Sequence, residues 1–353
     1  MLKLISLLGL ATLLGVAWAL SENRRRFPVR TVLWGLGLQF TLGFLILKTA
    51  PGRRLFDGIQ AGAKAFLGFA DEGNKLVFGA LGDPALAGRA FGPANATVLA
   101  VIVTGTIIFI SAMSSLLYHY GVLQRVVQAM AWVMRRLMGT SGSESLAAAA
   151  NIFMGQTEAP LVIKPYLARM TRSELMCLMV GGFATIAGGV FAVYTGVFQI
   201  PAGHLLTASV MSAPAALLIA KILLPETEAS DTRDGSPARI ERESINGIDA
   251  LCAGASDGMK LSLNVLAMLI AFTAVVALAN HLLSAGLAQA GWKTDRPLQE
   301  FFGYANAPFA FLLGIPSKDV LAVGQILGER IVLNEFIGYL SLSAQKASLD
   351  ERS

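Results

Sequence analysis

The chain has 353 residues, of which 54% are hydrophobic and only 14% are charged, and its formal net charge is +5. Soluble domains usually carry about 25% charged residues, so this composition argues against a soluble protein. The positive charge requires no nucleic-acid partner, because the cytoplasmic loops of membrane proteins supply such an excess by themselves. The two cysteines, Cys177 and Cys252, show no metal-binding or disulfide spacing.

Five long segments contain no Asp, Glu, Lys or Arg, namely 4–21, 31–47, 90–124, 175–220 and 261–292. A bilayer core is about 30 Å thick and is crossed by about 20 apolar residues in a helix. The longest segment is interrupted by Pro201 and Gly203, which predicts two spans joined by a tight turn. The sequence therefore predicts an all-α, multi-pass membrane protein embedded in a lipid bilayer.

The first apolar segment resembles a signal peptide, but no small-residue cleavage site precedes Ser21. We expect it to be a retained span. The loop that follows holds Arg24, Arg25, Arg26 and Arg30. Positive charges favour the cytoplasmic side, so this loop is expected inside and the N-terminus outside.

The central part of the chain alternates between surface helices and spans. Charged and apolar residues alternate over 51–81, which favours a helix lying along the membrane interface. A third span is expected within 96–118 and a second surface helix over 121–138. Charged residues around glycine and proline make 225–249 a polar linker between two halves of the chain.

Each half contains an apolar segment that is too interrupted for an ordinary span. The first is 146–168, broken at 155–160, and the second is 301–342, broken around 306–308 and again at 314–319. Proline removes a backbone donor and disfavours helix at the residue before it. Paired broken segments in the two halves of a transporter point to a binding site near the bilayer midplane.

The first break carries Gln156, Thr157 and Glu158. Together these side chains offer donors and acceptors that suit a planar polar ligand such as a nucleobase. The alternative is that they only satisfy the broken backbone, as polar residues at helix ends often do. A carboxylate at membrane depth is expensive, however, and by default marks a ligand or ion pathway.

A small hard cation is expected beside this break. Asn151 lies one turn earlier and could act together with the freed carbonyl of Met154. Four glycines in 181–189 surround Thr185 and Ile186, so unwinding there would expose further carbonyls. Close packing of small residues against another helix explains the glycines equally well.

A second carboxylate in an apolar setting is Glu335, which follows Asn334. An ion pair with Arg330 would explain it, but residues five apart are poorly placed on one helix face. We expect Glu335 to bind sugar hydroxyls.

These motifs resemble those of the bacterial concentrative nucleoside transporters over essentially the whole chain. The family signature reads Gly or Ala, any residue, Lys, three residues, then Asn-Glu-Phe-Val-Ala-Tyr, and the chain matches it at 328–339. Here Arg330 replaces the Lys, Ile337 the Val and Gly338 the Ala. The stretches GQTEAP, SELM, GGFATIAGG and LLPETE also resemble the family.

The resemblance implies an elevator-type transporter with two re-entrant hairpins, inverted repeats and a homotrimeric assembly in the bacterial inner membrane. It places Gln156, Thr157 and Glu158 against the base with Val190 packed nearby, and Glu335 against the ribose. It places sodium between Asn151, Thr185 and the carbonyls of Met154, Thr185 and Ile186. Uridine and related pyrimidine nucleosides are the expected substrates.

The expected domain organisation follows the same resemblance. Residues 1–140 hold the N-terminal spans, interfacial helices and scaffold elements, and 141–224 the first hairpin with two spans. A polar linker covers 225–250, a long scaffold span 251–295, and the second hairpin with the tail 296–353. Family members continue with two further spans, so we expect a chain that ends at Ser353 to be truncated or to lack them, and not to transport by itself.

The function expected of the complete protein is import of nucleosides coupled to inward sodium flow. Proton coupling through Glu158 or Glu335 is an alternative, and a membrane sensor that binds nucleosides without moving them is another. An intramembrane enzyme using the same two carboxylates is disfavoured, because the sequence shows no cluster of histidine metal ligands and no nucleophile paired with a base.

Overall fold

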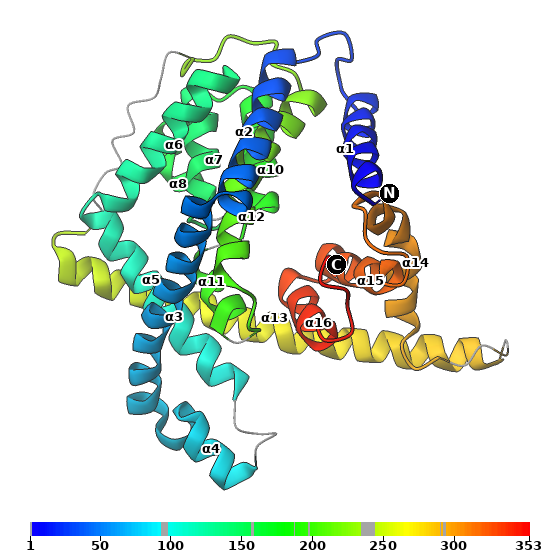
Figure 1. Cartoon of the computed structure of the whole chain (residues 1–353). Helices are drawn as coiled ribbons and strands as arrows, with labels where there is room; N and C mark the ends of the chain where they lie inside the picture. The colour runs from blue at the N-terminus through cyan, green and yellow to red at the C-terminus, as the bar shows by residue number, and fades with distance from the viewer. Residues whose placement is uncertain are drawn as a thin grey trace. The chain divides into compact units, whose positions relative to one another are not determined.

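A computed structural model describes residues 2–92, 98–156, 159–186, 188–196, 198–233, 244–289, 291 and 294–353. Within these ranges all regular structure is helical, as the hydropathy pattern predicts (Figure 1). The first helices are α1 (Leu2–Ala19), α2 (Val29–Lys48), α3 (Ala50–Phe78), the short 3-10 helix η1 (Gly79–Gly82), α4 (Pro84–Phe91), α5 (Leu99–His119) and α6 (Val122–Met138). The central helices are α7 (Gly142–Asn151), α8 (Ala159–Val162), α9 (Lys164–Leu167), α10 (Arg172–Ala184), α11 (Gly188–Gly196) and α12 (Ala202–Leu223). The last are α13 (Gly247–Gln289), α14 (Pro297–Leu312), α15 (Val320–Val332) and α16 (Glu335–Gln345).

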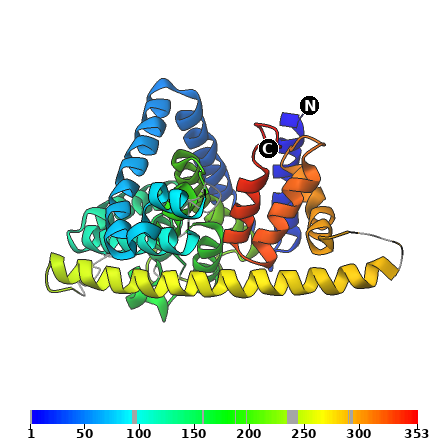
Figure 2. The same ribbon diagram turned by 90° about the horizontal axis from the view of Figure 1, so that it is seen from below.

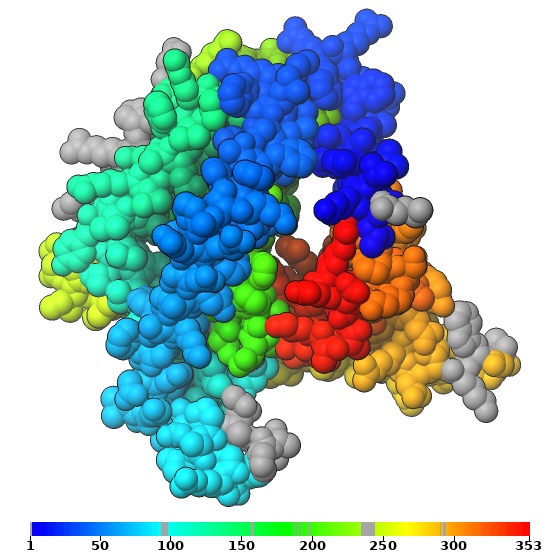
Figure 3. Space-filling model, in the orientation of Figure 1, coloured from blue at the N-terminus to red at the C-terminus, as the bar shows by residue number. Residues whose placement is uncertain are grey.

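Five of these helices are long and apolar enough to cross a membrane: α1, α2, α5, α12 and α13. Each overlaps one of the five charge-free segments, as the prediction of a multi-pass membrane protein requires. Large apolar side chains such as Leu33, Phe40 and Phe44 are exposed on α2, whose blue surface is visible in Figure 3. Exposed apolar side chains on a helix of this length suit contact with lipid rather than water.

The segment 175–220 contains the turn predicted at Pro201 and one further break. Its second half is the single helix α12, which begins after Pro201 as expected. Its first half is divided into α10 and α11, because Thr185 leaves the helix with φ −117° and ψ 160°. Both explanations for the glycine cluster at 181–189 are therefore supported, because the backbone unwinds at Thr185 and other parts of the chain approach Gly181, Gly182 and Gly188 closely.

Residues 1–16 and 263–353 form one compact unit, and residues 17–262 form another. In the second unit α7 lies among α6, α10 and α12, and all ten of its residues are buried (Figure 1). Such complete burial suits the sequence of α7, which is rich in alanine and small polar residues that allow close approach of neighbouring helices.

In the other unit, α14 and α15 pack side by side. A methyl group added to Gly324 would lie 2.6 Å from the carbonyl oxygen of Gly303, so glycine is needed for this approach. The predicted break at 306–308 is wrong, because α14 continues through Pro308 to Leu312. The Nδ2 of Asn306 donates to the carbonyl of Phe302 at 3.0 Å, one turn back, so the amide is satisfied without unwinding. The predicted break at 314–319 is confirmed, since it separates α14 from α15.

The long span expected after the linker is α13, which Figure 2 shows as one continuous helix. The linker itself is described at 225–233 and 244–246, and its centre at 234–243 lies outside the described residues. The segment 224–233 folds back onto the second unit, where the carbonyl of Thr232 accepts a hydrogen bond from the backbone N–H of Gly142 at 2.7 Å.

Candidate sodium and nucleoside site

The first broken segment begins with α7, which stops at Asn151. The N–H groups of Phe153 and Met154 both donate to the carbonyl of Ala150, which closes the last turn, and the chain then turns away. It resumes as the short helix α8, where the N–H of Ala159 donates to the carbonyl of Gly155 at 3.0 Å. A buried helix followed by a turn and a returning helix is the arrangement expected of a re-entrant hairpin. Gln156 is exposed at this turn, whereas Thr157 and Glu158 lie outside the described residues.

The turn after α7 runs along the break between α10 and α11. A methyl group on Gly181 would lie 3.1 Å from Nδ2 of Asn151, and one on Gly182 would lie 2.9 Å from Cβ of Gln156. The carbonyl oxygen of Phe153 occupies the space that a side chain on Gly188 would need. The glycines that interrupt this span therefore admit the hairpin turn, and two motifs 30 residues apart in sequence meet.

Asn151 lies at the centre of this meeting point. Its side chain is fully buried, and neither its amide nitrogen nor its amide oxygen has a hydrogen-bond partner among the residues that the structure describes. Leaving a buried polar group without a partner costs about 1–3 kcal/mol. An amide in this situation, at the end of a helix, is suited to a ligand that supplies the missing interaction.

The groups around Asn151 are suited to a small cation. The hydroxyl of Thr185 donates to the carbonyl of Gly181 at 2.9 Å, which leaves the hydroxyl lone pairs free to face a positive charge. Thr185 is extended and ends α10, so its backbone departs from the helical geometry at this point. The C-terminal ends of α7 and α10 both lie here, and helix C-termini carry partial negative charge. Amide, hydroxyl and carbonyl oxygens at broken helix ends are typical sodium ligands in transporters.

Three further predicted residues lie close to this break. Val190 is buried in the first turn of α11, two residues after Gly188, and Ile186 is buried at the break itself. Met154 lies in the turn that follows α7. The structure thus gathers Asn151, Met154, Thr185 and Ile186 along the same pair of facing breaks.

Glu335 belongs to the other compact unit. It is the first residue of α16, and the side chain of Asn334 caps this helix by accepting from the N–H of Ile337 at 2.9 Å. The preceding helix α15 ends at Val332, so Glu335 lies at a break, half-buried, at a helix N-terminus. The positive end of a helix dipole stabilises a carboxylate at this position.

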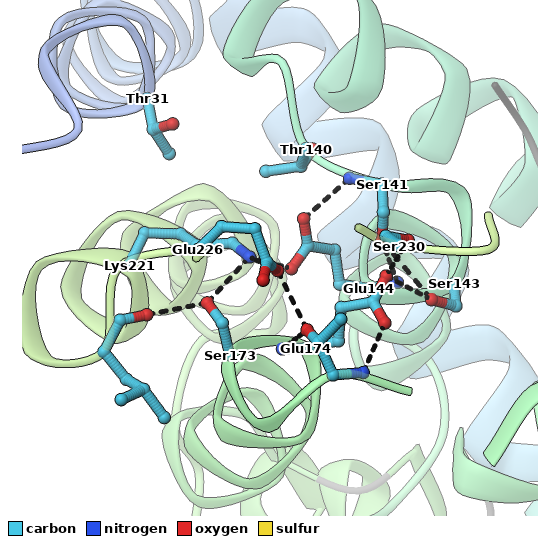
Figure 4. Close-up of polar contacts among 12 residues, drawn as sticks. Thr31, Thr140, Ser141, Ser143, Glu144, Ser173, Glu174, Lys221, Glu226 and Ser230 are labelled. Carbon is cyan, nitrogen blue, oxygen red and sulfur yellow. Dashed lines mark hydrogen bonds and ion pairs between the residues drawn. The ribbon is translucent and has the colours of Figure 1, made fainter. Parts of the chain in front are cut away.

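A buried polar cluster lies at the opposite end of α7 and was not predicted from the sequence (Figure 4). Both α7 and α10 begin with a capping box. In the first, the N–H of Ser141 donates to Glu144 Oε1 at 2.6 Å, and in the second the N–H of Thr171 donates to Glu174 Oε2 at 2.8 Å. The signal was present as Ser-Gly-Ser-Glu and Thr-Arg-Ser-Glu, both of the form Ser or Thr, two residues, then Glu.

Lys221, near the end of α12, joins the two helices. Its ammonium lies 2.7 Å from Glu144 Oε2 and 3.2 Å from Glu226 Oε2, and it donates to Ser173 Oγ at 2.9 Å (Figure 4). Only 6% of the Lys221 side chain and 1% of the Glu144 side chain are exposed, so water does not screen this pair. An interhelical pair of this kind joins residues far apart in sequence and has no periodic signature.

The segment 224–233 completes the cluster. The N–H of Ser143 donates to Thr232 Oγ1 at 3.1 Å, and the hydroxyls of Ser143 and Ser230 donate to Glu174 Oε1. The segment therefore satisfies donors at the start of α7 and the carboxylate at the start of α10. Its hydrogen bonds explain why this polar stretch returns to the helices.

Comparison with known proteins identifies the family to which the chain belongs. Three family models match it in order: the N-terminus of Na+ dependent nucleoside transporters at residues 8–81, nucleoside recognition at 100–201, and the C-terminus of Na+ dependent nucleoside transporters at 204–353. An uncharacterized transporter of Haemophilus influenzae is 39% identical over 343 residues, covering 96% of this chain and 79% of the relative. The chain belongs to the concentrative nucleoside transporter family.

The other matches agree with the family. Sodium/nucleoside cotransporter 1 of Mus musculus is 39% identical over 351 residues, or 98% of this chain and 51% of that protein. The structure of CNTnw in an inward-facing substrate-bound state matches with a TM-score of 0.90 and 36% identity, over 97% of this chain and 80% of that one. A CNTnw variant in an intermediate state matches with a TM-score of 0.92 and 35% identity, over 99% and 84% of the two chains.

Membership of the family confirms three predictions made from the sequence. The protein is a multi-pass membrane transporter of nucleosides and not an enzyme, and sodium is the coupled ion. The motifs at 155–160, 181–189 and 328–339 carried the resemblance on which these predictions rested.

Proposed function

We propose that this transporter imports pyrimidine nucleosides such as uridine, and that one sodium ion bound at Asn151 drives each cycle. The observation that carries the proposal is the buried Asn151 amide without a partner in the described part of the chain, facing the break at Thr185. A sodium ion there would tie the first hairpin to the break between α10 and α11. Its binding would give the hairpin turn the shape that receives the nucleoside.

The contacts to the nucleoside are proposed residue by residue, on the resemblance that the motifs carry. Gln156 is exposed at the first turn and is suited to the base, and Val190 supplies an apolar neighbour. Thr157 and Glu158, which lie outside the described residues, are assigned to the base on the sequence argument alone. Glu335 at the start of α16 is suited to the ribose, because a carboxylate accepts strong, charge-assisted hydrogen bonds from hydroxyls.

The energy for accumulation is proposed to come from the sodium ion. Moving one positive charge inward gains about 2.3 kcal/mol per 100 mV of membrane potential. At about 1.4 kcal/mol for each factor of ten, this corresponds to roughly 50-fold accumulation of the nucleoside, before any sodium gradient is counted.

The proposed movement is elevator-type alternating access in a homotrimer of the bacterial inner membrane. The orientation rests on the arginine-rich loop that follows α1. Glu22 in this loop pairs with Arg172 at the start of α10 at 3.1 Å, and its N–H donates to the carbonyl of Leu223 at the end of α12. If the arginines face the cytoplasm, the N-termini of α7 and α10 do so too, and the first hairpin enters the membrane from inside.

Uptake of labelled uridine into proteoliposomes that hold the complete protein, with its natural C-terminus, tests the function directly. We expect uptake driven by an inward sodium gradient and no uptake with a proton gradient alone. Uptake that survives removal of sodium and follows the pH gradient would replace sodium with proton coupling. Binding of uridine with no uptake under any gradient would favour a sensor.

Substitution of Asn151 tests the sodium assignment. Asn151→Ala removes the amide oxygen, so the sodium concentration for half-maximal uptake should rise at least tenfold while folding is kept. Asn264→Ala is the matched control, because Asn264 is exposed on α13 and lies outside the proposed site. An unchanged sodium dependence in Asn151→Ala would remove this residue from the site.

A further inference from the structure

The polar cluster around Lys221 lies outside the proposed binding site, although it is one of the most buried polar groups of the described chain. Glu144, Glu174 and Glu226 bring three carboxylates together, and Lys221 supplies a buried ammonium between two of them. Isolated buried charges are costly, and a buried ion pair often contributes little net stability. The arrangement therefore calls for a role other than stability, and fixing the register of helices is the best attested one.

The register concerned is that of α7 against α10. Glu144 and Asn151 are seven residues apart on α7, and Glu174 and Gly181 are seven apart on α10. A spacing of seven places two residues on the same helix face, about 10 Å apart at 1.5 Å per residue. Both helices start at the cluster and end at the proposed sodium site, so the cluster and the site lie at the two ends of one pair of parallel helices.

The connection between the ends is rigid. Every residue of α7 is buried, and three of its four consecutive alanines, Ala147 to Ala150, are completely so. Close-packed interiors transmit displacement rather than absorb it. A shift of α7 along α10 at the cluster would therefore move the Asn151 amide relative to Gly181 and Thr185 at the other end.

We propose that Lys221 is a positioning residue for sodium binding. By holding Glu144 of α7 beside Ser173 of α10, it fixes the register of these helices and so the place of the Asn151 amide. The segment 224–233 assists, because Glu226 and Thr232 tie the same two helix starts to the end of α12. The inference rests on the proposed function, since it concerns the sodium site assigned there.

The test replaces the buried pair with neutral side chains of similar size. Lys221→Met combined with Glu144→Gln removes one charge of each sign, and the Glu226 carboxylate that also pairs with Lys221 is 31% exposed and can be hydrated, so the protein should fold and be recovered from the membrane. Lys260→Met is the matched control, because Lys260 forms an exposed pair with Asp257 in which 72% of the lysine side chain is exposed. Sodium-dependent uridine uptake is measured for each variant, at varied sodium and at varied uridine.

The double variant should raise the sodium concentration for half-maximal uptake about tenfold, at the lower end of the roughly 10- to 100-fold loss of metal affinity that is typical when a group orienting a ligand is removed. The KM for uridine at saturating sodium should stay within twofold, a separation that general loss of structure would not produce. Lys221→Arg keeps the charge and should lie between the wild type and the double variant. Wild-type sodium dependence in the double variant would overturn the proposal.

Two further variants make every outcome informative. If the double variant does not fold, Glu226→Gln decides, because 31% of that side chain is exposed and the Lys221–Glu144 pair remains. It should raise the sodium requirement about threefold, and no change would overturn the proposal. Asn151→Ala separates the two hypotheses. If Asn151→Ala leaves the sodium dependence unchanged, the assignment of the sodium site fails. If Asn151→Ala weakens the sodium dependence but the double variant of Lys221 and Glu144 behaves as the wild type, only the positioning role of Lys221 is rejected.

Discussion

A methyl group added at Gly181 would press on the sodium site without removing any of its proposed ligands. The added carbon would lie 3.1 Å from Nδ2 of Asn151, and ordinary contact begins at 3.4 Å, so the amide must move by 0.3 Å (3.4 − 3.1). A misplacement of 1 Å in a preorganised site can cost about 10²-fold, so on a logarithmic scale 0.3 Å corresponds to about fourfold. We therefore expect Gly181→Ala to raise the sodium concentration for half-maximal uptake about fourfold.

The assay is the initial rate of labelled uridine uptake into proteoliposomes at a fixed membrane potential, with sodium varied at saturating uridine and uridine varied at saturating sodium. Alanine is favoured over glycine in a helix interior by about 0.5–1 kcal/mol. Weaker sodium binding in Gly181→Ala could therefore not be ascribed to a less stable helix. Gly196→Ala is the control, because its methyl group would meet only Leu67 Cδ1 at 3.7 Å. Unchanged sodium dependence in Gly181→Ala, or an equal rise in the KM for uridine, would refute the reasoning.

Three other substitutions follow from the same contacts. Gly182→Ala would place a methyl group 2.9 Å from Cβ of Gln156, a shortfall of 0.5 Å (3.4 − 2.9), so the KM for uridine should rise about tenfold with sodium dependence little changed. Gly105→Ala would overlap the buried Oδ1 of Asn74 and should destabilise the protein by about 1–3 kcal/mol, seen as a lower temperature of thermal unfolding in detergent. Thr232→Val removes the acceptor for the N–H at the start of α7 and should cost about 1 kcal/mol by the same measurement.

Each of these predictions has an outcome that contradicts it. Gly73→Ala, where a methyl group would meet nothing within 4 Å, is the control for the variant at Gly105 and should keep or raise the unfolding temperature. Equal unfolding temperatures for Gly105→Ala and Gly73→Ala would mean that Asn74 does not fill the space beside α5. A Thr232→Val variant as stable as the wild type would show that the segment 224–233 does not hold α7.

The sequence by itself determined the class and the family of the protein. Charge-free segments predict spans because a charged side chain is expensive in the bilayer, and that cost is local to each residue. The break at Pro160 and the glycines at 181–189 could likewise be read locally, because proline and glycine act on their own backbone. Asn151 and Thr185 were proposed as partners from these local signals and the resemblance. Their role at a sodium site stays a prediction.

The tertiary structure decided which local signals prevail and which distant residues meet. Pro308 disfavours helix locally, yet α14 continues through it, because α14 packs along α15 at Gly303 and Gly324 and burial outweighs one lost hydrogen bond. Lys221 reaches Glu144 across 77 positions of sequence (221 − 144), a pairing that no periodicity encodes. The parallel packing of α7 and α10 places the polar cluster at one end of the pair and the proposed sodium site at the other. No local signal in the sequence predicts this arrangement.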